Sequence, residues 1–120
     1  MEKRVRFLEH RGQRILLVDL SHCSAAEILG LLPEIQDVVT SEPRDSVLSL
    51  ADYTGAEVHR EVADRVKKTL VFDRPHVKKS ALVGTDHVPQ VFLEAFHTFA
   101  RRDFGLFQTR EEAMEWLVAE

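Results

Sequence analysis

The chain has 120 residues, of which 44% are hydrophobic and 30% are charged, with one cysteine and a formal net charge of −4. This composition excludes a disordered chain and a disulfide-stapled secreted fold, and no apolar run is long enough for a transmembrane helix or a signal peptide. We therefore expect a soluble cytoplasmic protein with one domain over residues 1–120.

The charge is unevenly distributed along the chain. Residues 1–18 carry +3, residues 19–57 carry −7, residues 58–79 carry +4 and residues 80–120 carry −4. Acidic side chains interrupt the basic segment at helical spacing, so no dominant basic face forms. This distribution argues against a nucleic-acid partner.

The chain begins with two predicted strands. Residues 3–9 partly alternate polar and apolar side chains, and residues 14–20 form a continuous apolar run that is typical of a strand covered on both faces. Gly12 between them favours a tight turn. The two strands should therefore pair antiparallel.

A helix and a third strand follow. Ser24 and Glu27 form a capping box that opens the helix. Pro33 should kink this helix or begin a new segment. Residues 46–51 have the pattern of a third strand, and the crossover through a helix predicts that it runs parallel to the second.

The next segment repeats this unit. Thr54 and Glu57 form a second capping box, which predicts a helix that starts at Thr54 and ends before Pro75. Residues 77–83 form a fourth strand, and a third helix should begin near Asp86.

The last segment contains a short strand and a final helix. Residues 106–107 read as the fifth strand, and Thr109 with Glu112 caps the helix after it. The sequence therefore predicts an α/β domain with a mixed sheet of about five strands, the first antiparallel, and four helices.

Three stretches of the chain resemble STAS domains, the fold of anti-sigma-factor antagonists such as the stage II sporulation protein AA. They are Ile15-Leu16-Leu17-Val18-Asp19-Leu20-Ser21, then residues 47–55, and the closing strand and helix over residues 107–117. The resemblance covers nearly the whole chain. It implies a STAS-like fold related to the lipid-binding Sec14 lobe. We expect a non-catalytic regulatory module that acts through protein contacts at the Asp52–Gly55 turn and the following helix, and we predict no cofactor.

The resemblance also indicates a candidate binding turn. STAS antagonists are typically phosphorylated on Ser or Thr at the start of a helix, and Asp52-Tyr53-Thr54-Gly55 resembles that turn, with Thr54 as the phosphoacceptor. The family also has a similar Asp-x-Ser-Gly sequence at the end of the preceding strand, and residues 52–55 fit that position equally well. In that alignment this chain lacks the turn that carries the phosphoacceptor. Alternatively, Thr54 is only a helix N-cap.

Two carboxylates offer a catalytic interpretation. Asp19 and Asp52 end neighbouring predicted strands, at the edge where open α/β sheets bind ligands, so they belong to the candidate binding turns or to acid/base chemistry. The simpler alternative is that both carboxylates cap loop N–H groups. Cys23 follows His22 just before a helix, a position that would lower its pKa and favour a nucleophile. The other histidines are scattered, so no metal site is predicted.

A second function is the binding of a small hydrophobic ligand. Five phenylalanines lie in residues 92–107, and Arg101 with Arg102 could hold an anionic headgroup. Alternatively, the phenylalanines form core and the arginines form a solvated helix end.

A homodimer is the third expectation. Basic side chains of the segment after Thr54 could contact an acidic partner, or the acidic segment 19–57 of a second copy. These side chains are Arg60, Arg65, Lys67, Lys68 and Lys78.

Overall fold

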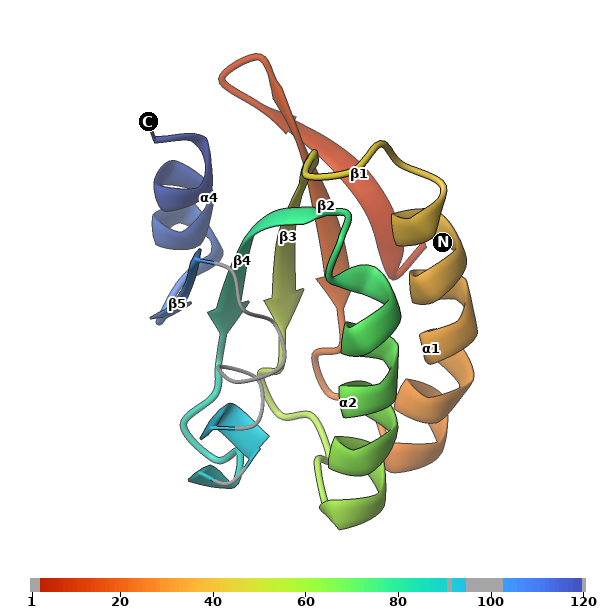
Figure 1. Ribbon diagram of the computed structural model, residues 1–120. Helices are drawn as coiled ribbons and strands as arrows, with labels where there is room; N and C mark the ends of the chain where they lie inside the picture. Colours follow the sequence, from red (N-terminus) through yellow and green to blue (C-terminus); the bar gives the residue numbers. More distant parts are fainter. Residues whose placement is uncertain (1–2, 91, 95–102, 120) are drawn as a thin grey trace.

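The computed structural model describes residues 3–90, 92–94 and 103–119. It contains one five-stranded sheet whose strands lie side by side in chain order, as Figure 1 shows. The strands are β1 (Val5–His10), β2 (Gln13–Asp19), β3 (Val47–Asp52), β4 (Val77–Val83) and β5 (Asp103–Phe107).

The first two strands form the predicted antiparallel hairpin. His10 pairs with Gln13 across a two-residue turn in which Arg11 and Gly12 both have positive φ, at 51° and 79°. Such a turn matches the twist of the strands it joins. All later pairings in the sheet are parallel. β5 is longer than the predicted 106–107. The prediction was too short because Asp103 and Gly105 break the apolar pattern in the first part of the strand.

The helices cover both faces of the sheet. α1 (Ala25–Thr40) and α2 (Arg60–Asp73) lie side by side on one face, and α4 (Arg110–Val118) packs on the opposite face, mainly against β3, β4 and β5. Residues 90 and 92–94 form a further helical segment between β4 and β5. The predicted mixed sheet with four helices is thus confirmed.

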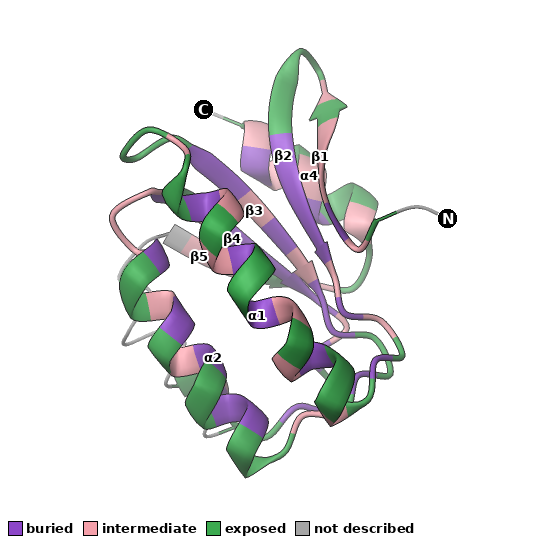
Figure 2. Ribbon diagram, turned by 90° about the vertical axis from the view of Figure 1, so that its right-hand side faces the viewer, coloured by how far each residue is buried: buried purple, intermediate pink, exposed green. Residues whose placement is uncertain are grey.

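Each face of the sheet has its own apolar core. Alternate side chains of β2 separate the two layers, because Leu16 and Val18 pack under α1 and α2 whereas Ile15 and Leu17 pack under α4. Both layers of side chains on β2 are buried, which explains its continuous apolar run. Figure 2 shows that α1 and α2 are buried on the side that faces the sheet and exposed on the opposite side.

The start of α2 was predicted wrongly. The helix begins at Arg60 with His59 as its N-cap, so Thr54 does not cap it. Tyr53 and Ala56 are buried instead, and residues 53–59 form a turn and a loop that lie against the core. The Glu57 carboxylate accepts a hydrogen bond from the Ala25 N–H at 2.9 Å, so it caps α1 and not its own segment.

The effect of Pro33 on α1 differs from the expectation of a new segment. α1 runs through Pro33 as one helix, and the Ser24–Glu27 capping box at its start is present in full. The side chain of Pro33 is exposed, so the ring lies on the solvent side of the helix and the buried face remains continuous.

Candidate functional site

The carboxyl edge of the sheet brings two predicted site residues together. Asp19 ends β2 and Asp52 ends β3, and the two residues are paired in register. This adjacency follows from the parallel crossover, which places the carboxyl ends of β2 and β3 at one edge. The prediction that the two carboxylates are neighbours is confirmed.

An arginine that the sequence did not indicate joins these carboxylates. Arg110, the first residue of α4, donates from Nε to Asp52 Oδ2 at 2.7 Å. Its Nη2 atom lies 3.2 Å from Asp19 Oδ1. The Asp52 side chain is only 8% exposed, whereas 32% of the Arg110 side chain is exposed. Arg110 thereby connects α4 with the carboxyl ends of β2 and β3.

The same carboxylates cap their own turns. Asp19 Oδ1 accepts hydrogen bonds from the Ser21 N–H at 3.0 Å and from the Ser21 hydroxyl at 2.5 Å. Asp52 Oδ1 accepts one from the Thr54 N–H at 2.9 Å. These contacts are those of the loop-capping interpretation.

The electrostatics keep both carboxylates ionised. Burial raises the pKa of Asp52, but hydrogen bonds from Thr54 and the charge of Arg110 outweigh it and lower the pKa below the ordinary value. Asp19 behaves alike, because hydrogen bonds from Ser21 and the charge of Arg110 outweigh burial. Since a general acid needs a raised pKa, this arrangement suits the positioning of turns better than proton transfer.

Two glycines allow close contacts between the loops at the carboxyl edge of the sheet. Gly55 has a φ of 67°, and a Cβ there would lie 2.8 Å from the His22 ring carbon Cε1. Gly84 after β4 has a φ of 71°, and a Cβ there would lie 2.7 Å from Thr54 Cα. The Thr54 side chain is exposed to solvent but sits against Gly84. A Cβ at Gly84 would meet backbone, whereas a Cβ at Gly55 would meet only the side chain of His22. Both positions also have the positive φ that favours glycine.

The remaining turn candidates are placed differently. Tyr53 is buried, with its ring 5.7 Å from the Phe92 ring in an edge-on contact, so it belongs to the core. Cys23 is also buried, and burial raises the pKa of its thiol. The expectation that the helix start lowers this pKa is therefore wrong, because Cys23 precedes the Ser24 cap and lies in the core.

The structure describes only part of the candidate lipid site. Arg101, Arg102, Phe96 and Phe99 lie outside the described residues. Phe92 is buried in the core. Within residues 3–90, 92–94 and 103–119 no cluster of three or more His, Cys, Asp or Glu side chains could hold a metal ion. No helix in these ranges is long and apolar enough to cross a membrane.

A second candidate site is the outer face of α1 and α2. Two large apolar side chains near the end of α2 are exposed, Val71 at 50% and Phe72 at 59%. Phe72 borders a groove of about 300 Å³ between the two helices. Arg65 and Lys68 line the α2 side of the groove, and Asp37 lies on its α1 side.

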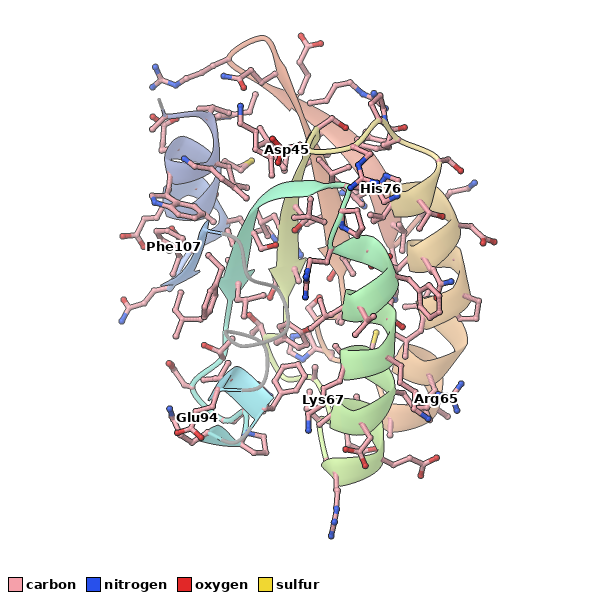
Figure 3. The ribbon with its side chains drawn as sticks, in the orientation of Figure 1. Asp45, Arg65, Lys67, His76, Glu94 and Phe107 are labelled. Carbon is pink, nitrogen blue, oxygen red and sulfur yellow. The ribbon has the colours of Figure 1, made fainter. Side chains whose placement is uncertain are left out.

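The basic residues predicted to form one surface do not all face this groove. Figure 3 shows Arg65 on the side of α2 toward α1, whereas Lys67 points to the other side. Lys67 lies 3.9 Å from Asp64. Lys78 is on β4, beside the β1–β2 hairpin. The basic surface is therefore narrower than the sequence indicated.

Comparison with known proteins identifies the fold. A scan against protein-family models finds no match, and neither does a search of curated proteins. Among solved structures, the chain is similar to an uncharacterised DUF3478-family protein from Shewanella loihica PV-4, described as having a SpoIIAA-like fold. The TM-score is 0.73 at 14% identity, over 94% of this chain and 91% of that one. This similarity confirms the STAS-like fold.

Proposed function

We propose that the chain is a non-catalytic STAS-like binding module that acts through protein contacts on the outer face of α1 and α2. The occupant of this face is a second copy of the chain. The exposed side chain of Phe72 beside the groove carries the proposal. Phenylalanine is one of the aromatic residues that are enriched in the buried cores of protein interfaces.

The charges of the two helices support a self-complementary contact. α1 has three exposed acidic side chains, Glu27, Glu34 and Asp37, and no basic residue. α2 presents Arg65 and Lys68 beside it. In a two-fold dimer, α1 of each copy would face α2 of the other, so that both sets of opposite charges meet.

These charges are available for such a contact. In the described part of the chain, neither Arg65 nor Lys68 comes within ion-pair distance of Glu34 or Asp37. Their pairing across an interface would therefore not require the loss of an existing ion pair. A contact with this electrostatic contribution should weaken as salt screens the charges.

Sedimentation velocity tests the proposal directly. The wild type should show a concentration-dependent dimer that dissociates at high salt, and Phe72→Ser should shift the equilibrium toward monomer. Leu106→Ser is the matched control, because Leu106 is also an exposed apolar side chain, at 49%, but lies on the edge strand β5. A wild type that stays monomeric at all concentrations would contradict the proposed occupant. Dissociation by Leu106→Ser alone would place the interface on β5.

Phosphorylation of Thr54 is a separate proposal that rests on the resemblance. The side chain is exposed, but no helix begins there to stabilise a phosphate. The added negative charge would also lie near Asp52, which follows from their shared turn. Intact-mass measurement of protein purified from its host, with Thr54→Val as the control, tests the modification. An unmodified mass under every growth condition would contradict it.

A further inference from the structure

A cavity of about 80 Å³ lies between the sheet and the helices α1 and α2. Most of its lining is apolar and comes from five elements, with Leu16 on β2, Leu32 on α1, Ala51 on β3, Val66 on α2 and Val77 on β4 among the residues. The volume is about half that of an engineered cavity of ~150 Å³ that binds benzene. The cavity suits a ligand of a few heavy atoms and is too small for a long acyl chain.

The lining of this cavity includes one buried carboxyl and two hydroxyls. Asp73 is the last residue of α2 and lines the cavity, and its side chain is buried, with 5% of the residue exposed. Its Oδ1 atom has no hydrogen-bond partner among the described residues. Ser49 and Ser80 also line the cavity, and their hydroxyl oxygens lie 3.0 Å apart.

Nothing in the lining neutralises this carboxyl. The only other titratable side chain around the cavity in the described residues is Tyr53, and no basic side chain lines it. Burial raises the pKa of Asp73 to about 7, in accord with the missing partner. An unpaired buried acceptor is costly, so a donor placed at Oδ1 would be favoured.

We propose that this cavity is a binding site for a small primary amine with a short apolar chain. The ammonium group would donate to Asp73 Oδ1, and the Ser49 and Ser80 hydroxyls offer further acceptors. The chain would fill the apolar part of the cavity. An ammonium group satisfies the carboxylate with both charge and hydrogen bonds, which a neutral alcohol does not.

The structure also suggests the route of entry. Leu32 and Thr69 line both the cavity and the surface groove between α1 and α2. A small molecule could therefore enter where these two helices meet. Because the proposed dimer would cover this groove, the test is performed at a concentration where the chain is monomeric. The cavity itself belongs to one copy of the chain, so the inference does not require the dimer.

The test is an NMR titration of the labelled chain with isobutylamine, isobutanol and isobutyrate at about pH 7, where Asp73 can ionise. Isobutylamine should cause saturable shifts of the Leu70 and Val77 amides, which flank the cavity. The apparent affinity for the alcohol and the acid should be lower by at least about tenfold. Equal responses to all three compounds would overturn the proposed preference for an amine. No response to any of them would overturn the site and leave a cavity for water only.

Two variants and one control make the result specific. Asp73→Asn should remove the preference for the amine, whereas Asp64→Asn should keep it, because Asp64 lies on the same helix but is exposed. If Asp73→Asn does not fold, Ala51→Val tests the site from the sheet side by filling the cavity, and it should abolish the shifts. Unchanged amine binding in either variant would overturn the proposal.

Discussion

Arg110→Met removes the cation that joins Asp19 and Asp52 while keeping much of the side-chain volume. Breaking a buried ion pair costs about 3–5 kcal/mol, because the remaining charge has no partner. The Arg110 side chain is 32% exposed, and solvent screening of exposed pairs reduces their contribution. The Thr54 N–H still supports Asp52 in the variant. We therefore expect a loss of about 2–3 kcal/mol in the free energy of unfolding near neutral pH.

The loss should depend on pH in a defined direction. In the wild type the pKa of Asp52 is lowered in the fold, so its ionised form stabilises the protein above the unfolded pKa, and this stabilisation is lost as the pH falls through the folded pKa. Without Arg110 the pKa of Asp52 should rise. The difference between the two proteins should therefore shrink on acidification.

Urea unfolding at several pH values measures this effect, with Arg11→Met as the control. Arg11 also pairs with a carboxylate, at 2.8 Å from Glu115, but both side chains are largely exposed, so its loss should be small. A loss for Arg110→Met no larger than for Arg11→Met, or one that does not change with pH, would refute the reasoning.

Two further changes test the buried acid and the turn geometry. The pKa of Asp73 is raised in the fold to about 7, so its contribution should destabilise the wild type progressively as the pH rises from about 4 to 7, by up to about 4 kcal/mol. Urea unfolding should show this decline in the wild type and in Asp64→Asn but not in Asp73→Asn; equal slopes would contradict it. Gly84→Ala should cost more stability than Gly12→Ala in thermal unfolding, because both have positive φ but only Gly84 faces a close neighbour, Thr54. Equal losses would show that the close contact is relieved without cost.

The fold was largely predictable because it depends on local patterns. The apolar run of β2, the turn at Gly12, the capping box at Ser24 and the N-cap at Thr109 are all present. The capping pattern at Thr54 misled the prediction, because Tyr53 and Ala56 are buried and Glu57 caps a different helix. A local pattern could not show that tertiary burial prevails there.

The candidate site was predictable only in part. The adjacency of Asp19 and Asp52 follows from parallel strand order, which the sequence indicates. Arg110 reaches them from a distant helix, and only one local signal pointed to it: a cation in the first turn opposes the helix dipole and needs another reason to be there. The exposed position of Phe72 was not predicted from the sequence. An apolar residue in a helix is normally assigned to the buried face of that helix.

The proposed dimer face is tested most directly by a charge-swap mixture followed by sedimentation velocity. One variant carries Arg65→Glu with Lys68→Glu, and the other carries Glu34→Lys with Asp37→Lys. Each variant alone should be monomeric, because like charges would meet across the two-fold contact. Their equimolar mixture should recover a dimer of one copy of each, since both α1–α2 contacts then regain opposite charges. A mixture that remains monomeric, when the wild type dimerises under the same conditions, would contradict the account.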